Sequence, residues 1–153
     1  MSKGLTLLEI LVVLGIIGVL ITFGTLNLRE YQRVSEVAQS AEDLSTVLRE
    51  AQSRSMAVVD RLPHGVHIET SNSTYVLFSG ATFNMGDPAN RTYTLPTSVE
   101  FLDPSLADGG TSVLFLQLTG STDTYGTVTL QSKTNSTMTR TITITNEGKI
   151  HIQ

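Results

Sequence analysis

The sequence contains no cysteine and no tryptophan, and only four of its 153 residues are proline. Without cysteine the chain forms no disulfide, so an exported domain would depend on packing alone for its stability. The first proline is Pro63, so no proline interrupts a helix upstream of it. No charged residue occurs from residue 10 to residue 28. These absences point to a long N-terminal helix whose first half is apolar.

The uncharged run is long enough to cross a membrane. A helix over residues 10–28 would be about 28 Å long at 1.5 Å per residue, close to the hydrocarbon core of roughly 30 Å. Lys3 precedes the run, so the positive-inside tendency keeps the short N-terminus cytoplasmic and exports the rest. The run exceeds the 7–15 apolar residues of a cleaved secretory signal and lacks an Ala-x-Ala site. A plain signal anchor would explain the run but would give no role to Glu9.

Glu9 lies immediately before this run. An ionised carboxylate near the centre of a bilayer costs about 2.5–3.5 kcal/mol, so acidic residues in such segments are usually functional and paired. The alternative is a side chain that extends to the lipid headgroups near the helix start. A functional Glu9 requires a cationic partner.

The hexapeptide Gly4-Leu5-Thr6-Leu7-Leu8-Glu9, followed by an apolar helix, resembles the N-terminal motif of type IV pilins and type II secretion pseudopilins. The resemblance implies that a prepilin peptidase cleaves the chain between Gly4 and Leu5 and methylates the new N-terminus at Leu5. Glu9 is then the fifth mature residue, and it pairs with the N-terminal ammonium of a neighbouring subunit during assembly. Leu5 departs from the family pattern, in which Phe or Met is commoner.

The same resemblance implies partners and a location. The precursor would be a single-pass protein of the inner membrane, with its N-terminus cytoplasmic and its head extracytoplasmic. It would then enter a pilus or pseudopilus filament with other pilin subunits, through an assembly ATPase and an inner-membrane platform protein.

Downstream of the uncharged run the helix becomes amphipathic. Apolar residues recur at three- and four-residue steps, as on one face of a helix: Tyr31, Val34, Ala38, Ala41, Leu44, Leu48 and Ala51. We therefore predict one helix from about Leu5 to Ala57. The predicted domains are a leader (1–4), a transmembrane and filament-core segment (5–28), an amphipathic helix segment (29–60) and a β-rich head (61–153).

The last ninety or so residues are rich in Thr, Ser, Val, Ile and Gly and alternate with period two, which predicts short strands. The expected strands are 66–68, 74–78, 99–102, 112–118, 126–130, 139–145 and 149–152. The final pair forms a hairpin that turns Ile142, Ile144, Ile150 and Ile152 inward. Loops are expected at 84–90 and 103–110. The fold class is thus α+β, with a long N-terminal helix packed on an antiparallel β-rich head.

The head also resembles minor pilins and H-type minor pseudopilins. The similarity lies in a Gly-Thr-Val-Thr-Leu strand and a terminal Thr-Ile-Thr-Asn-x-Gly-Lys-Ile hairpin. It implies a β-sandwich-like head, in contrast to the single disulfide-linked sheet of many major pilins.

The sequence gives little indication of catalysis, metal binding or nucleic-acid binding. No Gly-x-Ser-x-Gly motif is present, and the three histidines, His64, His67 and His151, lack the pattern of a catalytic triad or zinc site. The loop 103–110 has oxygen ligands that suit calcium, but a polar surface turn explains it better. Downstream of Ala57 the sequence has eight acidic residues and five basic ones. This excess of negative charge disfavours nucleic-acid binding. We expect no enzyme activity, no metal and no cofactor.

The sequence therefore predicts a structural subunit of a type IV pilus or a type II secretion pseudopilus. The alternatives are a minor pilin that acts as a DNA-uptake receptor and a plain signal-anchored extracytoplasmic binding domain.

Overall fold

The computed structural model describes residues 6–153, except for the side chains of residues 22–33. The chain divides into two compact units, Met1–Val34 and Ser35–Gln153. A 50-residue helix, α1 (Leu7–Met56), contributes residues to both units. This agrees with the helix predicted from Leu5 to Ala57, and it follows from the absence of proline and the favourable helix propensities of Leu, Ala, Glu and Arg.

One stripe of α1 packs into the head. Ala41, Leu44, Leu48 and Ala51 are fully buried, as the three- and four-residue spacing predicted. Val34 is 40% exposed, so its predicted place in the core is wrong. Val34 is the last residue of the first unit, whereas the packing of α1 on the sheets begins at Val37, one helical turn later.

Helix α1 ends in a short strained connection. The Ser55 hydroxyl accepts a hydrogen bond from the His64 backbone N–H at 2.7 Å and so ties the last turn to the first strand. Between them lies a 3-10 turn, η1 (Val59–Arg61), in which Asp60 and Arg61 have positive φ.

The head contains two antiparallel sheets. The first has the order β3-β2-β1-β6 and the second has the order β4-β7-β8-β9, with β5 also paired to β7. The strands of the first sheet are β1 (His64–Glu69), β2 (Thr74–Ser79), β3 (Arg91–Thr94) and β6 (Ser112–Phe115). Those of the second are β4 (Val99–Phe101), β5 (Ser105–Leu106), β7 (Gly126–Ser132), β8 (Asn135–Ile144) and β9 (Ile150–Ile152).

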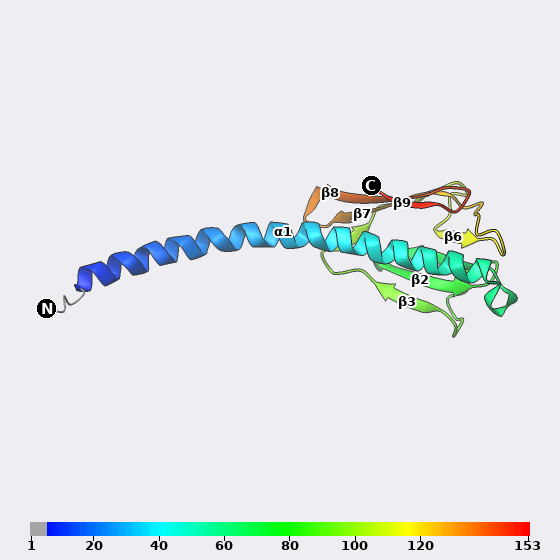
Figure 1. The fold of residues 1–153 in the computed structure, drawn as a ribbon, viewed down its shortest axis with the longest axis horizontal. Helices are drawn as coiled ribbons and strands as arrows, with labels where there is room; N and C mark the ends of the chain where they lie inside the picture. Colours follow the sequence, from blue (N-terminus) through cyan, green and yellow to red (C-terminus); the bar gives the residue numbers. More distant parts are fainter. Residues whose placement is uncertain (1–5) are drawn as a thin grey trace. The chain divides into compact units, whose positions relative to one another are not determined.

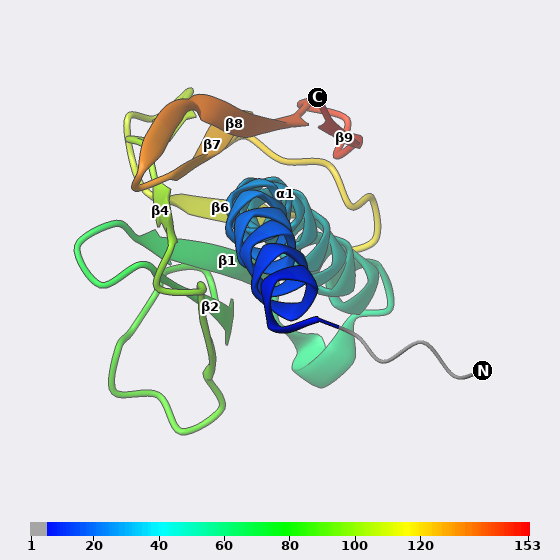
Figure 2. The same cartoon turned by 90° about the vertical axis from the view of Figure 1, so that its left-hand side faces the viewer.

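Within the head, α1 has the β7–β9 side of the second sheet on one flank and β1–β3 on the other (Figures 1 and 2). Val66 and Ile68 of β1, together with Val128 of β7, meet the helix stripe in one apolar core. Ile142, Ile144 and Ile150 are buried and Ile152 packs against the same core, so the predicted inward face of the last hairpin is confirmed. The α+β class, with a helix on antiparallel sheets, is likewise confirmed.

Two strands, β3 and β5, were not predicted from the sequence, and the predicted strand 112–118 was too long. Strand β3 contains only one side chain that packs on the core, Tyr93, so it shows no apolar alternation. Strand β5 lies inside the predicted loop 103–110 and pairs with β7 at Gly126. Gly126 has φ +152°, and a Cβ there would lie 2.0 Å from the Ser105 carbonyl oxygen, so this pairing requires glycine. The strand predicted to reach Leu118 ends at Phe115, because Leu118 has φ 67° in a turn.

Candidate functional site

The first turn of α1 places Glu9 three residues after a helix cap. The Glu9 backbone N–H donates to Thr6 Oγ1 at 3.3 Å, and the Ile10 N–H donates to the Thr6 carbonyl at 3.2 Å. Thr6 is thus the N-cap, and Glu9 occupies the third helical position, as in the capping-box pattern Ser/Thr-x-x-Glu. The sequence carries this pattern, but no role for Thr6 was predicted from it.

The position of Glu9 suits a carboxylate. The N-terminal turn of a helix carries partial positive charge on its unpaired N–H groups, which stabilises an acidic side chain by about 0.3–1 kcal/mol. Glu9 is exposed and is the acidic residue of this first turn. Its carboxylate can therefore both support the helix start and meet a cation from outside the chain.

The helix surface after Glu9 is apolar and uncovered. The large apolar side chains of residues 7–21 are between 45% and 81% exposed. A shallow hollow lies over Gly15, lined by Val12, Ile16, Val19 and Leu20. Because Gly15 has no side chain, a second helix can approach this part of α1 closely. This segment therefore presents a surface that a protein or lipid partner must cover.

The other two predicted site residues, Gly4 and Leu5, lie outside the described residues. In the part of the chain that the structure describes, no helix meets the length and hydropathy needed to cross a membrane.

The head places its histidines in separate surroundings. His64 is buried at the start of β1, whereas His67 lies on the outer face of the first sheet and stacks on Phe83, with ring centroids 4.0 Å apart. Among the side chains that the structure describes, no group of three or more metal-ligating residues lies in one place. In the loop 103–110, the Asp108 carboxylate accepts the Gly110 N–H, the pattern of a polar turn.

Several cationic side chains of the unit Ser35–Gln153 are paired with carboxylates. Arg54 and Arg91 both contact Glu50, at 2.6 Å and 3.4 Å, and Lys149 lies 3.1 Å from Glu147. These pairs reduce the positive charge available for phosphate groups.

No protein-family model matches the sequence, and no curated protein matches it in a sequence comparison. Solved structures do match. The chain is similar to the minor pseudopilin EpsH from the type II secretion system of Vibrio cholerae, with a TM-score of 0.60 and 14% identity over 77% of this chain and 96% of that chain.

The chain is also similar to the type IV minor pilin FimU of Pseudomonas aeruginosa. One crystal structure of that protein gives a TM-score of 0.61 and 15% identity over 78% of this chain and 89% of that chain. The chain therefore has the fold shared by minor pilins and minor pseudopilins.

Proposed function

We infer that this protein is a structural subunit of a type IV pilus or a type II secretion pseudopilus. The observation that carries this proposal is Glu9, an exposed carboxylate in the first turn of a helix whose following surface is apolar and uncovered. The pilin-like fold of the head supports the same conclusion.

The proposed first step is processing. A prepilin peptidase hydrolyses the peptide bond between Gly4 and Leu5, which removes Lys3 and leaves a new α-amino group on Leu5. The same enzyme methylates that amino group. Before assembly, residues 10–28 hold the subunit in the inner membrane, with the N-terminus cytoplasmic and the head exported.

The proposed second step is assembly. The ammonium on Leu5 of an incoming subunit pairs with Glu9 of a neighbour in the filament. Two charges that are costly alone in an apolar environment attract each other more strongly as the local dielectric falls. The pair sets the axial register, which contacts among Leu, Val and Ile side chains alone would define poorly. An assembly ATPase and its membrane platform would drive the insertion of each subunit.

The test compares Glu9→Ala and Glu9→Gln with Glu42→Gln, an exposed control on the same helix. Both Glu9 variants should insert in the membrane at wild-type levels and be strongly depleted from filaments, because the ammonium loses its partner. The control should assemble normally. Immunoblots of membrane and sheared-filament fractions measure both quantities. If filaments take up Glu9→Ala as efficiently as wild type, the chain is better explained as a plain signal-anchored domain.

Mass spectrometry of the assembled protein tests the processing step. The filament form should begin at Leu5 and carry one methyl group on its amino nitrogen. Recovery of filament subunits that retain Met1 would contradict the proposed mechanism.

A further inference from the structure

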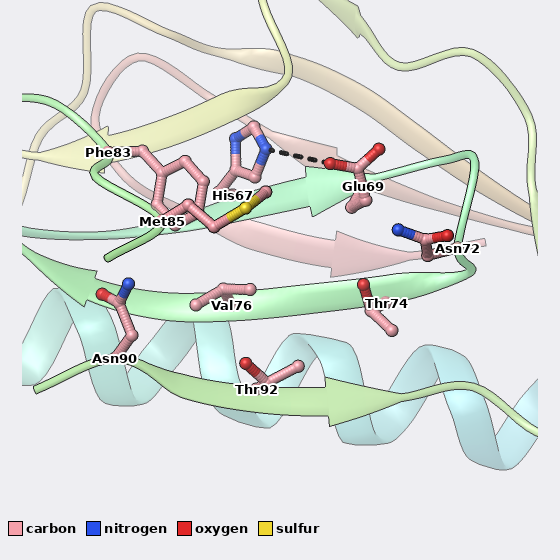
Figure 3. Close-up of a pocket in the computed structure, with 9 residues that line it drawn as sticks. All are labelled: His67, Glu69, Asn72, Thr74, Val76, Phe83, Met85, Asn90 and Thr92. Atoms are coloured by element: carbon pink, nitrogen blue, oxygen red, sulfur yellow. Dashed lines mark ion pairs between the residues drawn. The ribbon is translucent and has the colours of Figure 1, made fainter. Parts of the chain in front are cut away.

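The outer face of the first sheet carries a pocket of about 150 Å³, away from the apolar core (Figure 3). Nine residues from β1, β2, β3 and their connections line it: His67, Glu69, Asn72, Thr74, Val76, Phe83, Met85, Asn90 and Thr92.

Strand register builds the floor of this pocket. His67 of β1 pairs with Val76 of β2, and Val76 pairs with Thr92 of β3, so these three side chains form one row across the sheet. Glu69 and Thr74 form the next row. Because side chains alternate along a strand, the burial of Val66 and Ile68 in the core directs His67 and Glu69 to the opposite face.

The connection between β2 and β3 folds back over this floor. Phe83 stacks on His67 and meets the edge of Phe78, with ring centroids 5.6 Å apart. Gly65 makes this cover possible, since a Cβ there would lie 2.7 Å from the Phe78 ring. Phe83 therefore lies beside His67 with Met85 next to it, and these side chains and Val76 of β2 line the pocket (Figure 3).

Polar groups occupy both ends of the space. Glu69 and Asn72 lie at one end and Asn90 at the other (Figure 3). The Asn90 amide donates to the Asn84 carbonyl at 2.7 Å, which fixes its orientation. Its Oδ1 is shielded from solvent and accepts no hydrogen bond from the described residues. An acceptor in that state carries a desolvation cost in the unliganded head.

The charge of the pocket selects against anions. Neither lysine nor arginine is among its lining residues. His67 Nδ1 lies 2.8 Å from the Ser112 hydroxyl, and burial lowers the pKa of His67 although the nearby Glu69 carboxylate opposes this shift. The imidazole is therefore neutral at pH 7, and Glu69 is the charged group of the lining.

The mixture of hydrogen-bond donors and acceptors in the pocket lining limits the class of ligand further. Amides and hydroxyls such as those of Asn72, Thr74 and Thr92 both donate and accept, and they flank an apolar floor. A lone ammonium would use only the acceptors. A ring with several hydroxyl groups would use both kinds of group and place its C–H surface on Val76 and Met85. The space of about 150 Å³ far exceeds the roughly 10–15 Å³ that one water needs, so a ligand of the size of one ring has room.

We propose that this pocket binds one neutral sugar ring, either as a free sugar or as the end of a glycan. The inference goes beyond the role of a filament subunit, because the pocket lies in the head and involves none of the N-terminal assembly residues. A single small ring in an exposed site gains only a few kcal/mol, so binding should be in the millimolar range.

The experiment is an NMR titration of the full chain in a detergent without a sugar headgroup. The probes are the methyl glycosides of glucose, galactose, mannose and N-acetylglucosamine, with n-butylammonium as a cationic comparison. At least one glycoside should shift the signals of Val76 and Met85 with saturation in the millimolar range. An oligosaccharide that ends in the same sugar then tests the source, since tighter binding identifies a glycan and equal binding a free sugar.

Matched variants locate the binding. Thr92→Val should weaken glycoside binding about fivefold, the usual effect of one lost hydrogen bond. Thr94→Val, two residues along the same strand but outside the pocket, should leave it unchanged. Glu69→Gln keeps an acceptor and should weaken a glycoside only a few-fold. Unshifted core signals in each variant show that the fold is intact.

Three results would overturn the proposal. These are the absence of any glycoside shift at the pocket, equal effects of Thr92→Val and Thr94→Val, and n-butylammonium binding that Glu69→Gln abolishes. None of these results affects filament assembly, so the sugar site and the proposed function stand or fall separately.

Discussion

His64 is a buried ionisable residue at the junction between α1 and β1. Its backbone N–H is held by Ser55, whereas its ring Nδ1 is buried with no partner in the described part of the chain. Burial, and secondarily the positive charge of Arg54, lowers the pKa of His64 below the ordinary value of 6.5. A proton on this ring would therefore be disfavoured in the folded state.

We expect acidification to destabilise the head through this residue. Below pH 6.5 the unfolded chain binds a proton at position 64 that the folded chain resists, so the free energy of unfolding falls from about pH 7 towards pH 5. His64→Gln should flatten this pH dependence. His67, whose pKa is also lowered, retains part of it. Urea unfolding at several pH values measures the slope.

The exposed His151 provides the control for this prediction. His151→Gln should keep the wild-type slope between pH 7 and pH 5. An unchanged slope in His64→Gln would show that position 64 does not account for the acid sensitivity.

Glu9 shows how far the sequence alone defines a site. Its place in a motif and its isolation among apolar residues make it a candidate site residue without a structure. The structure added the cap at Thr6, whose hydroxyl fixes the position of Glu9 in the first helical turn. The pocket around His67 was not predicted, because its rows depend on which strands pair.

Gln52 joins three elements of the head. Its side-chain amide donates to the Gly120 carbonyl at 2.9 Å and to the Gly148 carbonyl at 2.8 Å, and so it ties α1 to the β6–β7 connection and to the β8–β9 turn. Backbone carbonyls that lose such a partner while partly buried incur a desolvation cost. This one side chain thus supports two loops that are distant in sequence.

We expect Gln52→Met, which keeps the length of the side chain, to reduce the free energy of unfolding by about 1–3 kcal/mol. Gln39→Met, at an exposed position on the same helix, should change it by less than about 0.5 kcal/mol. Thermal and urea unfolding of both variants provide the measurement. Equal effects at the two positions would mean that the amide bonds of Gln52 contribute nothing to stability.

At the level of elements, strands with buried side chains in alternation were predictable, and the mostly exposed edge strand β3 was not. Strand β7 alternates buried and less buried residues along most of its length, and β8 does so over its last four residues, 141–144. The sequence located β7 and the part of β8 that contains this alternation. Strand β3 has three exposed residues of four, and it exists because its backbone pairs with β2. Local periodicity carries no information about such pairing, since the partner lies elsewhere in the chain.

The apolar core of the whole molecule lies in one unit. Every buried hydrophobic residue among those described is at or after Val37, within Ser35–Gln153. The described side chains of residues 6–21 are all exposed. The unit Ser35–Gln153 should therefore fold without the N-terminal segment, whereas that segment requires a partner to cover its apolar side chains.

We expect a fragment of residues 35–153 to unfold in one cooperative transition, with a free energy close to that of the head in the full chain. Leu44→Ala, which empties a fully buried position, should destabilise both forms equally, by about 2–5 kcal/mol. Circular dichroism and chemical denaturation test this. A fragment that lacks a cooperative transition would show that residues upstream of Ser35 contribute to the fold.

The sequence by itself determined the long helix, the β-rich character of the head, the absence of disulfides and the N-terminal motif with Glu9. These features are local, since they depend on composition, spacing and the absence of proline. Only the tertiary structure decided the order of the strands in two sheets, the point at which the head begins to cover α1, and the pocket over Val76. Those features arise from contacts between residues far apart in the chain, whose free energies no local pattern expresses.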